Sequence, residues 1–185
     1  MLIRILVFLL ETAFFILIAA ALLRAWMNWL RISMTGQPGR FVMALSDWLV
    51  KPLRRSLPKS LARSRLDWAS VVAAALMALG YALLWWVLVG LQAGGMALAP
   101  AALAGLLLMA LKMLVRVALQ MLFMLVLGYA VLSWVQPGSM AYGLLARLTE
   151  PLLAPLRRVV PTVGGVDLSA LVLLLVLQVG MMVLL

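Results

Sequence analysis

The sequence contains no cysteine and no histidine, and only five of its 185 residues are acidic. The missing cysteine and histidine exclude disulfides, thiolate nucleophiles, Cys/His metal sites and imidazole acid–base chemistry. Catalysis by paired carboxylates would require two of the five acids to converge. We therefore expect no catalytic residues, no metal site and no cofactor, and a protein that is not an enzyme.

Polar residues of every kind are scarce. Hydrophobic residues make up 68% of the chain and charged residues 11%, with a mean hydropathy of +1.21. Soluble domains are roughly half apolar and a quarter charged, so a soluble fold of this composition would lack polar side chains to cover its surface. A bilayer solvates apolar side chains directly. The composition therefore predicts an integral membrane protein.

Four apolar windows have the length of membrane spans: about residues 2–23, 68–91, 117–135 and 168–185. A helix needs ~20 residues to cross the ~30 Å hydrocarbon core. A helix continuing through residues 99–111 into the third window would be about 52 Å long at ~1.5 Å per residue. We interpret that stretch as an interfacial or tilted extension of the third span. The pattern predicts an all-α polytopic membrane protein with four transmembrane helices.

Basic residues are concentrated between these windows. The chain has 15 Lys and Arg and a net charge of +10. Nine basic residues lie from Arg24 to Arg65, none lies from Gln92 to Pro100 after the second span, and three (Arg147, Arg157, Arg158) lie between the third and fourth spans. Because basic loops stay in the cytoplasm, we expect both basic segments inside and both termini outside. Tryptophans would anchor the two interfaces, Trp26, Trp29 and Trp134 inside and Trp85 and Trp86 outside.

The two basic segments share the motif P-L-R-R-x-x-P, at residues 52–58 and 155–161. In each copy one acidic residue lies five positions before the first proline, and an aspartate later opens an apolar helix. These acids are Asp47 and Asp67 in the first copy, and Glu150 and Asp167 in the second. We therefore expect two tandem repeats of helix, basic loop and helix, divided into residues 1–95 and 96–185.

Prolines and aspartates in the repeats predict local helix ends. Proline lacks an N–H and suits the first position of a helix, so a short turn is expected between the prolines of each motif, started by Pro52 and Pro155 and ended by Pro58 and Pro161. Asp67 and Asp167 are expected to cap the second and fourth spans, because aspartate accepts backbone N–H groups and complements the helix dipole.

Two adjacent arginines lie between the prolines of each motif, Arg54 with Arg55 and Arg157 with Arg158. A guanidinium group pairs with phosphate in a bidentate manner, so each arginine pair is a candidate clamp for anionic lipid headgroups, or a contact for a partner. The alternative is that they serve only as a topology signal. Before the first pair, apolar residues at helical spacing predict an interfacial helix, namely Phe41, Ala44, Leu45, Trp48 and Leu49.

One charged residue falls within an apolar span. Glu11 lies about 22 Å along the helix from Trp26, inside the hydrocarbon, where ionisable groups are often functional. Lys112 and Arg116 share one helix face because they are four residues apart. We expect Glu11 to approach Arg116 or Lys112. The alternative is that it stays protonated or packs in a polar pocket.

The sequence resembles the YggT family of small bacterial membrane proteins, which is related to chloroplast-encoded and chloroplast-targeted proteins. The resemblance covers essentially the whole chain. It rests on the L-R-x-W ending of the first span, the two P-L-R-R-x-x-P motifs and a G-G-x-D run, with the single residues Leu23, Arg24, Trp26, Gly164, Gly165 and Asp167. The first copy departs from the pattern, since residues 62–66 replace the glycine-containing approach to the aspartate.

The resemblance implies a multi-pass protein of the bacterial plasma (inner) membrane, linked to osmotic or ion homeostasis and, in other members, to cell division, nucleoid distribution or assembly of a haem protein. Haem ligation does not transfer, because the chain has no His or Cys. We favour a non-enzymatic scaffold or assembly factor whose basic loops dock anionic lipid or a partner.

The alternative function is a channel or transport component, with Glu11, Gln120 and Gln178 as pathway residues. The expected partners are membrane lipids and either a second copy of the chain or another membrane protein. Nucleic acid is not expected, because no DNA-binding or RNA-binding motif is present.

Overall fold

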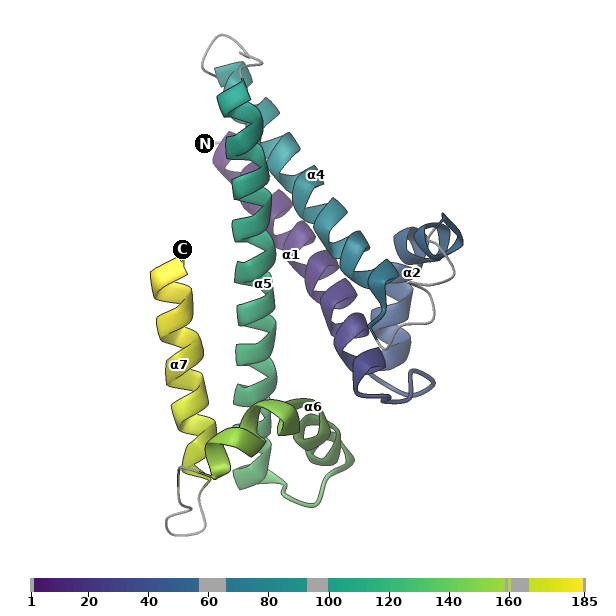
Figure 1. Cartoon of the computed structure of the whole chain (residues 1–185), viewed down its shortest axis with the longest axis vertical. Coiled ribbons are helices and arrows are strands. Elements are labelled where there is room, and N and C mark those ends of the chain that lie inside the picture. The colour runs from purple at the N-terminus through teal and green to yellow at the C-terminus, as the bar shows by residue number, and fades with distance from the viewer. Residues whose placement is uncertain (1, 57–65, 93–99, 159, 161–166, 185) are drawn as a thin grey trace. The chain divides into compact units, whose positions relative to one another are not determined.

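The computed structural model describes residues 2–56, 66–92, 100–158, 160 and 167–184, and within these ranges the chain forms helices and no strand (Figure 1). The helices are α1 (Leu2–Trp29), α2 (Gly39–Ser56), α4 (Trp68–Gln92), α5 (Pro100–Val135), α6 (Met140–Arg157) and α7 (Leu168–Leu184). The all-α class is confirmed. Three helices are long and apolar enough to cross a bilayer, at Arg4–Trp29, Trp68–Leu88 and Ala102–Val135, and α7 contains a shorter apolar helix, Leu168–Val183.

Helix α5 corrects one expected boundary. The sequence analysis placed the start of the third span at residue 117, whereas α5 runs unbroken from Pro100 for 36 residues. At 1.5 Å per residue this helix is about 54 Å long. Its first half consists mainly of Ala, Leu and Met, which favour helix, and Pro100 fits the first helical position because the N–H there needs no partner. Nothing in this composition would end a helix before residue 117.

The chain forms two compact units, Met1–Val117 and Ala118–Leu185. The boundary between these compact units falls inside α5. The division of the sequence repeats after residue 95 stays a prediction. The first half of α5 contributes Ala110, Met113 and Val117 to the apolar core of the first unit. The second half belongs to the second unit.

In the first unit, α1 and α4 run antiparallel and side by side (Figure 1). Alanines fill much of their contact, and those fully buried are Ala21, Ala73, Ala74, Ala78 and Ala82. Small side chains let helix backbones approach closely, which is how membrane helices gain packing energy without a hydrophobic driving force. Beside Ala82 of this contact, the ring of Tyr81 lies 5.9 Å from the ring of Phe14, measured between centroids.

Helix α2 packs against both α1 and α4. Its buried face consists of Gly39, Val42, Ser46 and Val50, which recur at helical spacing. Phe41 and Trp48 are each 59% exposed and lie off this face. At the start of α2 a Cβ on Gly39 would lie 2.6 Å from the Cα of Met34, so the close approach of the preceding turn requires glycine.

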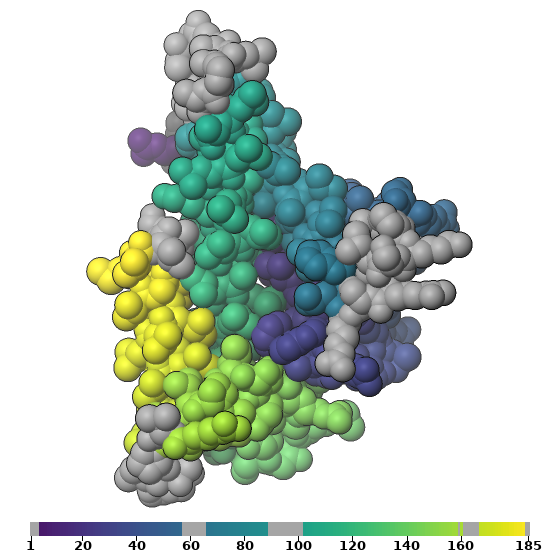
Figure 2. Space-filling model, in the orientation of Figure 1, coloured from purple at the N-terminus to yellow at the C-terminus, as the bar shows by residue number. Residues whose placement is uncertain are grey.

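The second unit contains the second half of α5 together with α6 and α7. Helix α6 begins at the N-cap Ser139, whose hydroxyl accepts the backbone N–H of Tyr142 at 3.1 Å. Buried Val126, Leu153 and Leu173, from α5, α6 and α7, share one apolar core. The side chains of α7 form part of the surface of this unit (Figure 2), and its large exposed apolar residues are Leu171, Leu175, Val176, Val179, Met182 and Val183.

The prolines of the two motifs do not begin a turn as expected. Pro52 lies inside α2, which continues to Ser56, and Pro155 lies inside α6, which continues to Arg157. Proline inside a helix removes one backbone hydrogen bond, but packing retains the last turn, because Leu53 and Leu156 lie against the apolar cores of their units. Pro58 and Pro161 lie outside the described residues.

We predict that Ala78→Leu destabilises the first unit by about 1–3 kcal/mol, because the added methyl groups have no space between α1 and α4. Reversible unfolding of the purified protein in mixed micelles, followed by tryptophan fluorescence, measures this change. Ala75→Leu is the matched control, since Ala75 is on the same helix and only partly buried. Equal destabilisation by the two substitutions would contradict the role of Ala78 in this contact.

Candidate functional site

A buried carboxylate joins three helices of the first unit. Asp67, the residue before α4, has only 8% of its side chain exposed. Its Oδ2 accepts hydrogen bonds from Asn28 of α1 at 2.7 Å, from Arg54 of α2 at 2.6 Å and from the Ser70 hydroxyl at 2.8 Å. The Asp67 cluster is defined here as Arg24, Asn28, Arg54, Asp67 and Ser70. It holds the ends of α1 and α2 against the start of α4.

Arg24 extends this cluster along α2. Its side chain is 7% exposed, and Nη1 donates to Asp47 Oδ1 at 2.7 Å and to the Ser46 hydroxyl at 2.9 Å. Its Nε lies 3.9 Å from Asp67 Oδ2, and Lys51 Nζ lies 2.8 Å from the other oxygen of Asp47. A buried guanidinium group is tolerated only when paired and hydrogen-bonded. Both conditions are met for Arg24.

The second unit places a related cluster at the start of α7, defined here as Tyr129, Glu150, Arg157, Asp167 and Ser169. Arg157 donates from Nε to Asp167 at 2.9 Å, from Nη1 to Glu150 at 2.9 Å and from Nη2 to the Tyr129 hydroxyl at 2.8 Å. Asp167 Oδ1 accepts the Ser169 backbone N–H at 3.1 Å and also the Ser169 hydroxyl. This Asp167 cluster therefore binds the end of α6 to α5 and to the first turn of α7.

The electrostatic surroundings keep three aspartates ionised. Burial alone would raise the pKa of Asp67 and of Asp167, but hydrogen bonds from Ser70 and Arg54, and from Ser169 and Arg157, bring each pKa below its usual range. The hydrogen bond from Lys51 is the main cause that lowers the pKa of Asp47.

The structure separates the two members of each arginine pair. Arg54 and Arg157 bind Asp67 and Asp167. Arg55 and Arg158 are exposed and form no ion pair with any residue in the described ranges. Consecutive residues on a helix point about 100° apart, so adjacent arginines cannot both face one carboxylate. In each pair, therefore, the first arginine makes an internal contact and only the second remains exposed.

The expected approach of Glu11 to Arg116 is present within the first unit. Arg116 Nη1 donates to Glu11 Oε1 at 2.9 Å, which joins α1 to α5 across the apolar part of both helices. Lys112, the alternative partner, is exposed and forms no ion pair with the described residues. No group of three or more acidic side chains able to hold a metal ion occurs within the described ranges.

The family model described as CCB3/YggT matches residues 3–88 and 108–185, which include both polar clusters. The chain belongs to the CCB3/YggT family. The YggT protein of Escherichia coli (strain K12) is 32% identical over 175 residues, or 94% of this chain and 86% of that protein. A Vibrio alginolyticus protein of the proC 3′ region is 33% identical over 172 residues, covering 92% and 88%. No solved structure matches.

Several members of the clusters in this YggT-family chain were not singled out as site residues from the sequence. Arg24 was counted among the basic residues and in the L-R-x-W ending, but not as a site residue, and Asn28, Ser46 and Tyr129 were not singled out at all. Tyr129 lies 28 residues from its partner Arg157 in the chain. The sequence did offer one signal for these residues, namely their polar side chains near the end of an apolar helix. Such a side chain needs a polar partner close to the interface.

We predict that acid destabilises the protein through its aspartates. A carboxylate whose folded-state pKa is lowered contributes stability that is present above its unfolded pKa, about 4, and is lost as the pH falls through the folded value. Thermal unfolding midpoints measured from neutral pH down to about pH 3 should therefore fall less steeply for Asp67→Asn than for the unchanged protein. Parallel curves for the two proteins would contradict the assignment.

We also predict that Glu11 and Arg116 are energetically coupled by about 1 kcal/mol or more, because their pair lies in an environment of low polarity. A double-mutant cycle of Glu11→Gln and Arg116→Gln, read by unfolding in mixed micelles, measures the coupling. The charge exchange Glu11→Arg with Arg116→Glu should recover part of the stability. A cycle of Glu11→Gln with Lys112→Gln is the control and should be additive, and additivity in both cycles would exclude the pair as a stabilising contact.

Proposed function

We propose that this chain is a non-enzymatic scaffold of the bacterial plasma membrane that crosses the bilayer four times and docks anionic lipid headgroups on its cytoplasmic side. The observation that carries the proposal is the surface of α2. Phe41 and Trp48 are exposed beside the exposed cations Arg40, Lys51 and Arg55. Apolar side chains flanked by cations are typical of a helix that lies in the interface of an anionic membrane.

The lengths of the helices support four spans. Helix α7 has 17 residues and is about 26 Å long, close to the ~30 Å hydrocarbon core, and Asp167 at its start would remain at the interface. Helix α5 is long enough to extend beyond the hydrocarbon. The distribution of Lys and Arg supports a cytoplasmic position for both basic segments. In this proposal α2 and α6 lie on that side and both termini lie outside.

The acidic side chains support the absence of enzymatic activity. The sequence has five acids. Each of them, Glu11, Asp47, Asp67, Glu150 and Asp167, forms an ion pair in the structure. A carboxylate held ionised by arginine is a poor general acid or base at neutral pH. The pairing of Glu11 also favours a role in packing over a place in an ion pathway.

The test separates the paired from the exposed arginines. Arg55→Gln with Arg158→Gln should lower the retention of anionic lipid roughly tenfold, because each juxtamembrane cation contributes about 1 kcal/mol before screening. Their unfolding midpoint should stay unchanged. Arg54→Gln with Arg157→Gln should instead lower the midpoint. Lipid co-purified from bilayers of phosphatidylglycerol and phosphatidylcholine is quantified by mass spectrometry.

Arg4→Gln with Lys112→Gln is the matched control. Both side chains are exposed, and the predicted topology places them toward the outer side, so the control removes the same charge without reaching the cytoplasmic surface. Equal loss of anionic lipid in the control, or unchanged retention without Arg55 and Arg158, would contradict the docking surface. Selective ion flux through proteoliposomes would favour a channel over a scaffold.

A further inference from the structure

The two polar clusters differ in charge. In the first unit the carboxylates of Asp47 and Asp67 pair with three cations, Arg24, Lys51 and Arg54. In the second unit Glu150 and Asp167 share one cation, Arg157. The described ion pairs of the second cluster therefore leave one negative charge without a cation of its own.

The sequence shows why the second cluster has fewer cations. Arg24 precedes Trp26 by two positions, and the residue two positions before the corresponding Trp134 is Leu132. The buried arginine of the first unit thus has an apolar counterpart in the second. An anionic group in an environment of low polarity is stabilised by a nearby cation, so the second site favours a cation supplied by another molecule.

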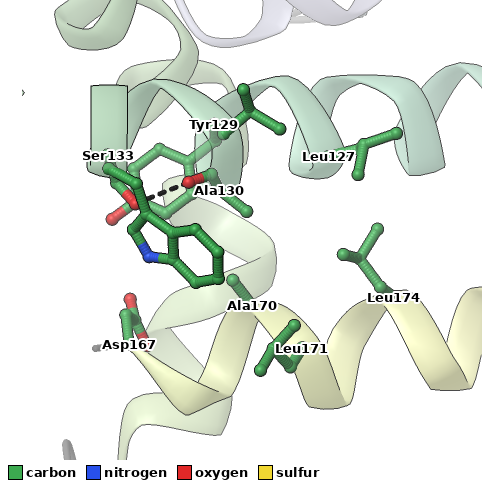
Figure 3. Close-up of a pocket in the computed structure, with 10 residues that line it drawn as sticks. Leu127, Tyr129, Ala130, Ser133, Asp167, Ala170, Leu171 and Leu174 are labelled. Atoms are coloured by element: carbon green, nitrogen blue, oxygen red, sulfur yellow. Dashed lines mark hydrogen bonds between the residues drawn. The ribbon is translucent and has the colours of Figure 1, made fainter. Parts of the chain in front are cut away.

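A pocket of about 120 Å³ lies between α5 and α7 of the second unit and is lined by Asp167, one of the two carboxylates that share Arg157. Asp167 and Ser133 lie at its polar end, and Leu127, Leu171 and Leu174 line the rest (Figure 3). Trp134 also lines the pocket. The volume is several times the roughly 10–15 Å³ that a single water requires. It is large enough for a small organic group.

The lining matches a cation attached to an apolar chain. A carboxylate and an indole ring are the two side-chain groups that bind organic ammonium ions best, by charge-assisted hydrogen bonds and by cation–π attraction. The lowered pKa of Asp167 keeps its carboxylate charged at neutral pH. Leu171 and Val131 are exposed apolar residues beside the pocket, as expected where lipid chains pass.

We propose that this pocket binds the ammonium headgroup of an aminophospholipid, a phosphatidylethanolamine-type lipid, with Asp167 and Trp134 as the residues that recognise the cation. The ammonium group occupies the polar end at the start of α7. The glycerol and the first part of an acyl chain follow the leucines of α5 and α7. The site is separate from the anionic-lipid surface proposed above and does not depend on it.

The experiment measures which lipids the full-length protein retains. Purified protein in mixed micelles receives equal amounts of phosphatidylethanolamine, its mono- and dimethylated forms, phosphatidylcholine and phosphatidylglycerol, and bound lipid is counted by native mass spectrometry. Retention should fall as methyl groups replace the N–H donors to Asp167. Asp167→Asn should lower the retention of phosphatidylethanolamine about tenfold, since a charge-assisted contact is lost. Asparagine also caps helices, so the start of α7 is kept.

A second pocket variant, Leu171→Trp, accompanies Asp167→Asn, and each of the two has a matched control. Glu150→Gln removes the same charge from the Asp167 cluster, but Glu150 does not line the pocket. Leu171→Trp fills the pocket without touching the charges, and Leu175→Trp makes the same change one turn further along α7, at an exposed residue outside the pocket. Phosphatidylethanolamine should be retained by Leu175→Trp and lost from both pocket variants. Glu150→Gln should lower its retention less than Asp167→Asn does, because Glu150 contributes charge but no contact in the pocket.

Three results would overturn the proposal. The first is equal retention of phosphatidylethanolamine and phosphatidylcholine, which shows that the ammonium hydrogen bonds are not recognised. The second is unchanged retention in Leu171→Trp, which places the lipid elsewhere even if Asp167→Asn fails to fold. The third is an equal loss of bound phosphatidylethanolamine in Glu150→Gln and Asp167→Asn. That result would show that only the net charge of the cluster matters, not a contact with Asp167. Phosphatidylglycerol retention, read in the same spectra, reports separately on the anionic-lipid surface.

Discussion

The rest of the structure depends on one kind of ion pair. It joins an arginine at the end of an amphipathic helix to the aspartate that precedes the following apolar helix. It is formed by Arg54 with Asp67 and by Arg157 with Asp167. Each carboxylate begins an apolar helix, where burial raises the cost of a charge. The arginine offsets that cost, and in doing so it fixes where α2 and α6 end relative to α4 and α7.

The two units satisfy this constraint in different ways. The first unit surrounds Asp67 with donors from three elements and adds the buried Arg24, so its cations outnumber its acids. The second uses the three nitrogens of Arg157 for two carboxylates and one hydroxyl. The ion-paired residues of this unit therefore carry one net negative charge, although the chain as a whole is strongly basic. Two units with related polar clusters can in this way differ in their electrostatic preference.

Membership of the CCB3/YggT family fixes the class of the molecule and leaves its activity to be argued from its sites. The described residues offer few groups for chemistry, because every acidic side chain is already paired. What they present instead is a set of exposed aromatic and basic side chains on α2 and a partly polar pocket between α5 and α7, on which the two lipid proposals rest.

The sequence alone determined the membrane class, the helical nature of the chain, the family and the positions of both aspartates at helix starts, because composition, hydropathy and motif spacing are local properties. It also indicated that Glu11 would meet Arg116, since few partners exist for a charge inside an apolar span.

Only the tertiary structure decided which arginine of each pair meets an aspartate, because that choice depends on how two packed helices rotate about their axes. The same holds for Arg24, which lies 22 residues from Ser46 in the chain yet donates to its hydroxyl. The helical setting of Pro52 and Pro155 was likewise decided by packing, which overrides the local preference of proline to end a helix.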